Sequence, residues 1–265
     1  MKYTETNKQA WEHAFENRKA GFGEENYKIL NQEHLPFFYD EMKIELENID
    51  FKNAVIAQFC CNNGRELLSL AGLPGVERVV GFDIAENIIK QARDTAEKAG
   101  ITGCEFVACN ILEIDEKWYG KFDAVLLTIG AICWFEDLGE LFGVAAKCLK
   151  PDGKVLIHEI HPFENMLPMP GEEGFDPNIS DKFAYSYFRS DPWIQSNGMT
   201  YMTGLAESKT FTSFSHTLGS IITALADNGL FVTRLKEHDY GVSGMTDLYD
   251  GKGIPLSYVM IAKNL

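Results

Sequence analysis

A carboxylate and a turn before it are the first residues whose types and spacing suggest chemistry. Asp83 ends the apolar run 79–83, 19 residues after Gly64, which closes the turn 60–64. Nucleotide-binding βαβ units place a carboxylate at about this distance, roughly 20 residues on, where it accepts hydrogen bonds from ribose hydroxyls. The turn follows the short apolar run 54–59 and precedes a helical pattern, so free backbone N–H groups are expected at the helix start. These residues predict a nucleoside site.

The composition of the turn narrows the kind of nucleotide. It contains one glycine, Gly64, preceded by Asn62 and Asn63. Asparagine tolerates the left-handed backbone better than other non-glycine residues. Dinucleotide folds use the pattern G-x-G-x-x-G so that the backbone can approach a pyrophosphate. Because the turn lacks two of these glycines and carries no basic side chain, it favours a ligand without a pyrophosphate and opposes a Rossmann dehydrogenase.

A second candidate group stands at the end of another apolar run, 154–160, and consists of His158, Glu159 and His161. Strand side chains alternate, so His158 is expected on one face and Glu159 and His161 on the other. A histidine is the usual general base near neutral pH, although a buried, hydrogen-bonded structural histidine is the alternative. Two histidines and a glutamate also suggest a metal site, but no third ligand of known spacing follows, so no metal is predicted.

Residues 56–64 resemble the first motif of class I S-adenosylmethionine-dependent methyltransferases. That motif runs roughly hhDhGCGxG, where h is an apolar residue, and Ile-Ala-Gln-Phe-Cys-Cys-Asn-Asn-Gly aligns with it without gaps. The sequence departs from the motif where Gln58 replaces the acidic residue and where Cys60 and Asn62 replace the first two glycines. The resemblance implies S-adenosyl-L-methionine as cofactor and methyl transfer to a small-molecule acceptor as activity.

The resemblance also assigns roles to residues that follow the strands. Asp83 corresponds to the residue that binds both ribose hydroxyls, with a helix N-cap as the alternative. Asn110 corresponds to an aspartate that binds the adenine amino group, with a turn residue as the alternative. Thr128 begins the loop that passes under the methionine part of the cofactor. The predicted cofactor-binding residues are Gln58, Cys60, Cys61, Asn62, Gly64, Asp83, Ile84, Asn110, Ile111, Thr128 and Trp11.

Three residues are predicted to be catalytic on the acceptor side. Glu159 and His161 end the run 154–160, and His216 lies in a segment similar to one bacterial methyltransferase branch. Methyl transfer from a sulfonium is an in-line displacement, for which alignment of the reactants alone can lower the barrier by about 7–11 kcal/mol. A base is needed only when the acceptor must lose a proton. Trp134 is either a core aromatic or a wall of the acceptor pocket.

Apolar runs alternate with helical patterns along most of the chain, which predicts an α/β fold with a mostly parallel sheet between two helix layers. The resemblance, which covers residues 50–160 and 216–263, implies a doubly wound, Rossmann-like, seven-stranded sheet in the order 3-2-1-4-5-7-6 with strand seven antiparallel. The expected strands are 54–59, 78–83, 104–108, 122–128, 154–160, 230–235 and 256–262, and the expected helices are 64–71, 85–99, 136–149 and 217–227.

Two segments fall outside this alternation. Residues 1–49 are predicted to form an N-terminal helical cap or lid, and residues 161–215 an inserted substrate lid. Residues 50–160 and 216–265 are then the cofactor-binding core. Within the insertion, alternating residues at 184–189 and 200–206 predict a hairpin or small sheet, and a turn is expected at 150–153.

Composition limits the partners. The net charge of -15 and pI of about 4.8 oppose electrostatic capture of nucleic acid or of an anionic membrane. The six cysteines include no C-x-x-C pair and are interpreted as reduced thiols. No apolar run approaches the roughly 20 residues of a membrane span. A cytoplasmic protein with a small-molecule substrate is therefore expected, with a homodimer as the assembly to consider.

Because the first motif is degenerate at Gln58 and Cys60, a second function stays open. The protein could bind S-adenosylmethionine or S-adenosylhomocysteine without methylating anything, as a sensor or regulatory subunit.

Overall fold

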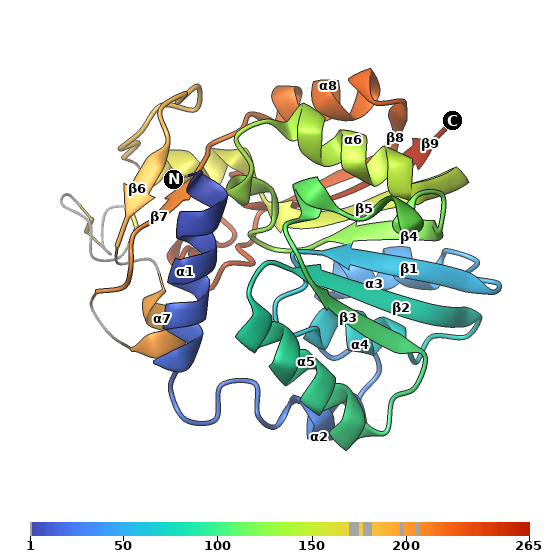
Figure 1. Ribbon diagram of the computed structural model, residues 1–265. Helices are drawn as coiled ribbons and strands as arrows, with labels where there is room; N and C mark the ends of the chain where they lie inside the picture. The colour runs from blue at the N-terminus through green and yellow to red at the C-terminus, as the bar shows by residue number, and fades with distance from the viewer. Residues whose placement is uncertain (1, 170–174, 177–181, 197–198, 205–206) are drawn as a thin grey trace.

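Seven strands form one mostly parallel sheet (Figure 1) in the order β3-β2-β1-β4-β5-β9-β8. The computed structural model describes residues 2–169, 175–176, 182–196, 199–204 and 207–265. Only β9 runs antiparallel to its neighbours β5 and β8. This is the predicted order and orientation, so the predicted fold class is confirmed. The strands are β1 (Ala54–Phe59), β2 (Val76–Asp83), β3 (Cys104–Ala108), β4 (Phe122–Leu127), β5 (Leu149–Ile160), β8 (Leu230–His238) and β9 (Ser257–Asn264).

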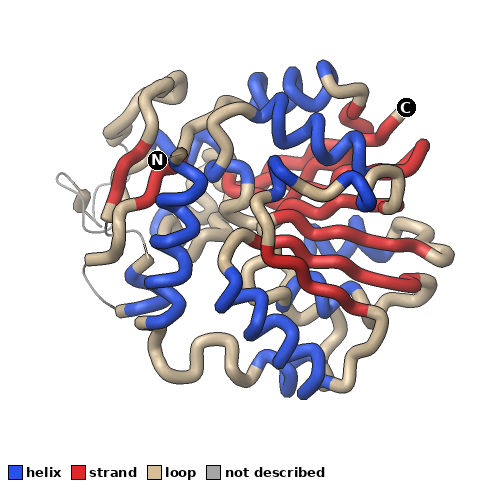
Figure 2. The backbone as a smooth tube through the Cα atoms, viewed as in Figure 1, coloured by secondary structure: helices blue, strands red, loops and turns tan. Residues whose placement is uncertain are grey.

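Helices cover both faces of the sheet (Figure 2). One core lies between the sheet and the side chains of α3 (Asp40–Glu47), α4 (Arg65–Leu70) and α5 (Glu86–Ala99). The other lies between the sheet and α6 (Leu138–Cys148) with α8 (Leu218–Asp227). The short α2 (Asn26–Leu30) contacts α4 and α5. The result is the three-layer arrangement that positions ligands at the carboxyl ends of the parallel strands.

The central strands show why the sequence specifies this arrangement. Ile56 packs in the core under α3, α4 and α5, whereas the next residue, Ala57, packs in the core under α6 and α8, and both are 0% exposed. A strand that is buried on both faces is apolar at consecutive positions instead of alternating. The short apolar run after residue 53 is therefore a central strand.

The N-terminal helix α1 (Tyr3–Glu16) lies beyond the sheet and packs against part of the insertion (Figure 1). The insertion contains a two-stranded antiparallel sheet of β6 (Trp193–Gln195) and β7 (Phe211–Ser213), and the short helix α7 (Thr200–Thr203). The Asn7 carboxamide joins the two parts: its Nδ2 donates to the Thr212 carbonyl at 2.8 Å, and its Oδ1 accepts from the Thr212 N–H at 2.7 Å. We call α1, α7, β6 and β7 together the lid.

Three local predictions are wrong. Residues 184–189 form no strand: the N–H groups of Ala184 and Tyr185 donate to the Met166 carbonyl, and the Tyr185 ring packs edge-on against Trp193. Residues 200–203 are helical, and 205–206 lie outside the described residues. The small sheet exists, but at β6 and β7. Residues 150–153 are part of β5, where a left-handed Asp152 (φ 65°) accompanies a shift in register with β4.

The predicted boundary at residue 49 does not separate two packing units. Met42 and Leu46 of α3 are 1% exposed and share a core with the sheet, whereas Ala10 and Ala14 of α1 belong to a separate cluster with β7. The division into cap, core and insertion stays a prediction. Within the described residues, no helix is long and apolar enough to cross a membrane. The remaining short helices are η1 (Ile111–Glu113), η2 (Glu116–Trp118), η3 (Ile132–Trp134), η4 (Pro162–Met166) and η5 (Asp247–Tyr249).

Candidate active site

Asp83 stands at the carboxyl end of β2 and organises the turn after β1. Its Oδ2 accepts the N–H of Asn62 at 2.8 Å and its Oδ1 accepts the N–H of Ala85 at 3.0 Å. Burial raises the pKa of the Asp83 carboxyl above its usual value, while the N–H groups of Ala85, Asn62 and Ile84 lower it. A carboxylate has about four acceptor positions, so capacity remains for ribose hydroxyls. The N-cap role and the ribose role are therefore compatible.

The turn itself uses left-handed backbone at three positions. Cys60 (φ 54°), Asn62 (φ 48°) and Gly64 (φ 72°) all lie in that region. For Cys60 this conformation is strained, and strain of this kind concentrates at functional sites. Gly64 is also needed for packing, because a Cβ there would approach the Phe106 ring to 2.4 Å. The sequence suggested a nucleoside role for Gly64 but gave no sign of Phe106.

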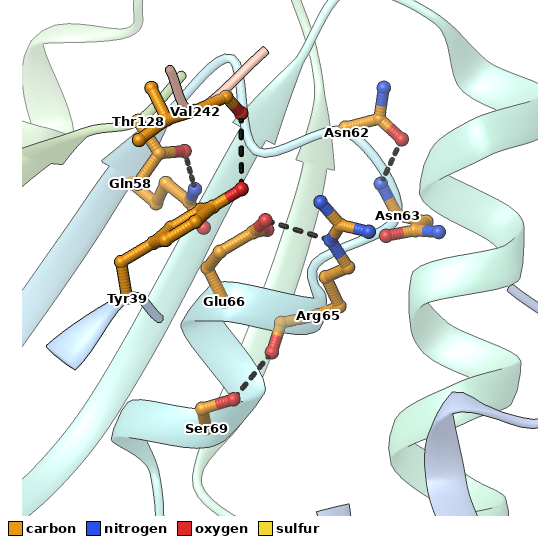
Figure 3. A network of polar contacts seen from close by, with 9 residues as sticks. All are labelled: Tyr39, Gln58, Asn62, Asn63, Arg65, Glu66, Ser69, Thr128 and Val242. Carbon is orange, nitrogen blue, oxygen red and sulfur yellow. Dashed lines mark hydrogen bonds and ion pairs between the residues drawn. The ribbon is translucent and has the colours of Figure 1, made fainter. Parts of the chain in front are cut away.

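Gln58 and Thr128 lie together at the ends of the central strands β1 and β4. The Gln58 Nε2 donates to the Thr128 Oγ1 at 2.8 Å (Figure 3). Gln58 is 0% exposed, and its Oε1 is buried without a hydrogen-bond partner in the described part of the chain. Close by, the Tyr39 hydroxyl donates to the Val242 carbonyl at 3.4 Å. The structure brings both predicted residues to one place and leaves one acceptor atom available there.

A cavity of about 530 Å³ lies beside the carboxyl ends of β2 and β3, and we call it, with the turn after β1, the crevice. Ile84 and Asn110, two predicted cofactor residues, line it together with Lys2 and Lys8 near the start of α1. The Asn110 Oδ1 accepts the Leu112 N–H at 3.2 Å, which is the turn role that the sequence left open as the alternative. Ile111 follows and is 5% exposed in the core.

Three thiols lie at the same carboxyl edge. Cys60 and Cys133 are electrostatic neighbours of each other, and Cys60 is also a neighbour of Cys109 and Asp83. Burial raises the pKa of all three thiols, that of Cys109 to about 11. Cys61 is 0% exposed and its thiol pKa is likewise raised by burial. These thiols are protonated near neutral pH and serve as small apolar walls.

Glu159, predicted to be catalytic, is 4% exposed and binds backbone. Its Oε2 accepts the N–H groups of Gly130 at 2.7 Å and Ile160 at 2.8 Å, and its Oε1 accepts that of Ile132 at 3.1 Å. Burial raises its pKa to about 7, against the lowering effect of these N–H donors. Glu159 therefore supports the loop after β4, which is where the acceptor was expected.

The two predicted catalytic histidines also bind protein atoms. The His161 Nδ1 accepts the Phe163 N–H at 3.0 Å, and its Nε2 lies 2.9 Å from the Glu237 Oε1. The His216 Nε2 lies 2.8 Å from the Phe135 carbonyl oxygen, to which it can only donate. Burial lowers the pKa of both rings. Neither His161 nitrogen is available as a base, and in His216 only Nδ1 is left for that role.

Trp11 and Trp134 meet at the boundary between lid and core. Their ring centroids are 5.4 Å apart at an interplanar angle of 77°, and Trp134 also lies 5.7 Å from Phe211 of β7. The sequence pointed to Trp11 and Trp134 separately. Phe211 and the contact among the three rings were missed, because the rings are far apart in the chain. About 120 residues separate Trp11 from Trp134, and 77 separate Trp134 from Phe211.

These features fit S-adenosylmethionine better than a dinucleotide. Three features support this fit. The Asp83 carboxylate at the end of β2 has acceptor positions left, the turn 60–64 lacks the glycines that would let a pyrophosphate approach, and the Gln58 Oε1 is a buried acceptor. A family model described as the methyltransferase domain matches residues 50–201, which is more than half of the chain. The chain belongs to this methyltransferase family. The predicted family, enzyme class and cofactor, S-adenosyl-L-methionine, are therefore confirmed at the level of the family.

Two curated relatives match part of this methyltransferase. An uncharacterized protein of Rickettsia prowazekii is 28% identical over 129 residues, which are 48% of this chain and 23% of that protein. The ribosomal protein L11 methyltransferase of Tolumonas auensis is 31% identical over 116 residues, which are 43% of this chain and 37% of that protein. The matched region thus spans only about a quarter to a third of these relatives.

Solved structures share the fold of this methyltransferase at low sequence identity. A structure described as a putative S-adenosylmethionine-dependent methyltransferase from Listeria monocytogenes superposes with a TM-score of 0.63 at 17% identity, over 84% of this chain and 98% of the other. Geranyl diphosphate C-methyltransferase from Streptomyces coelicolor, solved with S-adenosyl-L-homocysteine, gives 0.63 at 13% identity over 100% and 98%. At these identities the comparison supports the fold alone.

Proposed function

We propose that this protein transfers a methyl group from S-adenosylmethionine to a small-molecule acceptor that binds under the lid. The observation that carries the proposal is the aromatic group of Trp11, Trp134 and Phe211, which lies where the lid meets the loop after β4. Aromatic walls suit an acceptor that is partly apolar and neutral or cationic. The cofactor would supply an activated methyl group on a sulfonium.

The chain's own residues have three tasks in this proposal. Asp83 would hold the ribose, with its remaining acceptor positions, and Gln58 with Thr128 would line the floor next to the methionine part. The lid would exclude water and align the acceptor, which is the main requirement of an in-line displacement. The proposal assigns no general base, because Glu159 and His161 are engaged with protein atoms. His216 stays a candidate only for acceptors that must lose a proton.

The alternative of binding without catalysis rests on the departures at Gln58 and Cys60. Both positions belong to the cofactor side, so they bear on affinity more than on the transfer step. The acidic composition continues to favour a small molecule over nucleic acid as partner, and the dimeric state and the cytoplasmic location stay predictions.

The test is the release of S-adenosylhomocysteine from S-adenosylmethionine in the presence of fractionated metabolite pools. We expect release that depends on one fraction and on the protein. Calorimetry with S-adenosylmethionine, S-adenosylhomocysteine and NAD supplies the control, with binding of the first two only. Tight binding without release in any fraction would support the sensor instead, and binding of NAD alone would overturn both functions.

A further inference from the structure

The loop after β4, residues 128–132, is held from both neighbouring strands. On the β1 side, the Gln58 carboxamide donates to the Thr128 hydroxyl at 2.8 Å. On the β5 side, the Glu159 carboxylate accepts the N–H groups of Gly130 and Ile132 at 2.7 and 3.1 Å. β4 lies between β1 and β5 in the sheet, so the two side chains reach the loop from opposite sides. The loop lies beyond the last pair of β4 with β5, Leu127 and Ile157, and is held by these side chains together with the bond from the Ala131 N–H to the Thr128 carbonyl at 3.0 Å.

The chemistry of the Glu159 contacts selects the ionised carboxylate. All its partners, the N–H groups of Gly130, Ile132 and Ile160, can donate but not accept. A protonated carboxyl, or an amide in its place, presents a hydrogen toward at least one of these donors. The loop contacts therefore persist with the carboxylate and are weakened when it takes up a proton.

The surroundings of Glu159 contain few other groups that titrate. Cys133 on η3, Cys60 after β1 and Tyr258 on β9 interact with it electrostatically, and burial raises the pKa of each of them. Glu164 on η4 also interacts with it, and burial raises the pKa of its carboxyl to about 7. Of these four described groups, Glu164 is the one whose pKa lies in the same range as that of Glu159.

We propose that Glu159 is a positioning residue: as a carboxylate it fixes the loop 128–132 for the cofactor, so that binding of S-adenosylmethionine weakens when Glu159 is protonated. This inference rests on the proposed function insofar as that function places the methionine part of the cofactor next to Thr128. It differs from the sequence-based prediction, in which Glu159 itself would act on the acceptor. Here Glu159 touches neither the cofactor nor the acceptor.

Glu164 provides a matched control within the same structure. It is 1% exposed and its pKa is also raised to about 7 by burial, but its partners are the hydroxyls of Ser243 and Thr246 at 3.0 and 2.7 Å. Hydroxyls can donate or accept, so they adapt to an amide at this position. Glu164→Gln should therefore be tolerated where Glu159→Gln is not.

The experiment measures the dissociation constant of S-adenosylmethionine by calorimetry at pH 6, 7 and 8 for the wild type, Glu159→Gln and Glu164→Gln. A group that titrates near pH 7 is about one-tenth ionised at pH 6 and nine-tenths at pH 8, so wild-type affinity should rise roughly tenfold. Glu159→Gln should bind at least about tenfold more weakly than the wild type at pH 8, and its affinity should stay flat from pH 6 to pH 8 once the cofactor's own titration is subtracted. Glu164→Gln should keep both affinity and pH dependence, with its midpoint moved slightly downward because a neighbouring negative charge is gone. The cofactor's own amino group titrates identically with all three proteins.

Amide hydrogen exchange, followed by mass spectrometry at one pH without cofactor, tests the loop directly. Peptides that cover 128–134 should lose protection in Glu159→Gln and keep it in Glu164→Gln. Equal protection in the two variants, or wild-type affinity that is flat from pH 6 to pH 8 once the cofactor's titration is subtracted, would overturn the inference. If the wild type binds no S-adenosylmethionine but the exchange pattern is as expected, the proposed function fails and the positioning role stands.

Discussion

The turn after β1 with Asp83, which we call the nucleoside side after its proposed role, and the lid are built in opposite ways. On the nucleoside side, the turn after β1 and Asp83 after β2 belong to consecutive strand–helix units and bind each other through the Asn62 N–H at 2.8 Å. The lid joins α1 to β7, and its central contact pairs Asn7 with Thr212, 205 residues away in the chain. The nucleoside side is therefore formed by residues close together in the sequence. The lid forms only when the end of the insertion packs against the N-terminal helix.

This difference in construction determines how easily substitutions can change the ligand specificity of each region. The nucleoside side is fixed by the sheet, because Asp83 ends β2 directly after Phe82, which pairs with Phe59 at the end of β1. The lid is fastened to the core by side chains: α1 packs on Ala85 and Ile88, the Asn87 Nδ2 donates to the Glu12 carbonyl at 2.9 Å, and Trp11 contacts Trp134. Side chains and a loop insertion change more easily than a sheet does. Specificity for the acceptor is therefore expected in the lid, and specificity for the cofactor in the sheet edge.

The largest effect is expected at Asp83. Asp83→Ala should weaken S-adenosylmethionine binding by roughly 10²- to 10⁴-fold, because two hydrogen bonds to a charged acceptor contribute about 1.5–3 kcal/mol each. Calorimetry measures the affinity. Asp115→Ala is the control: the Asp115 Oδ1 accepts the Lys117 N–H at 2.9 Å and caps a short helix away from the turn. If Asp83 only caps its helix, both variants would lose some thermal stability and keep cofactor affinity.

Sequence alone was sufficient for the sheet, and it brought the turn after β1 and Asp83 together, while their nucleoside role stays a prediction. Burial on both faces makes the central strands continuous apolar runs, and the spacing from Gly64 to Asp83 follows from one strand–helix–strand unit. Strand and helix boundaries differed from the predicted ones by a few residues. The larger errors were the turn expected at 150–153, which is part of β5, and the insertion, where alternating residues at 184–189 bind other parts of the chain and form no strand. Alternation is evidence for a strand only when a partner strand is available.

The roles of charged residues at β5 could not be read from residue type. Glu159 and His161 lie at the end of β5, where active-site groups are expected, yet Glu159 accepts N–H groups of the loop after β4 and His161 accepts the N–H of Phe163 in η4. Which partner a carboxylate finds depends on where the loops after β4 and β5 fold, and no spacing rule encodes that. The raised pKa of Glu159 also means that folding favours its protonated form, so stability should fall as the pH rises from about 4.5 to about 7.

A smaller effect is expected at the fastening of the lid. Asn7→Ala removes the hydrogen bonds from the Asn7 side chain to the Thr212 N–H and carbonyl, which should weaken the join between α1 and β7 within the lid by about 1–3 kcal/mol. Hydrogen exchange should rise in both α1 and β7, with the sheet unaffected. Asn17→Ala is the control. It removes a carboxamide of the same kind at the end of α1, where the Asn17 Nδ2 donates to the His13 carbonyl of the same helix at 2.8 Å. Faster exchange in α1 without any change in β7 would mean that the two parts of the lid move independently.

The smallest effect tests whether the aromatic contact links the lid to the core. In a double-mutant cycle of Trp11→Ala and Trp134→Ala, the free energy of S-adenosylmethionine binding should show a coupling of about 0.5–1.5 kcal/mol, the range for an edge-to-face aromatic pair. Trp11→Ala with Trp118→Phe is the control cycle, because Trp118 packs in the core against Phe82 and Phe122, and should be additive within about 0.5 kcal/mol. Coupling near zero in the first cycle would mean that the rings contribute equally to the free and the bound protein. The lid would then be joined to the core independently of the cofactor, and the two regions compared above would also be separate in function.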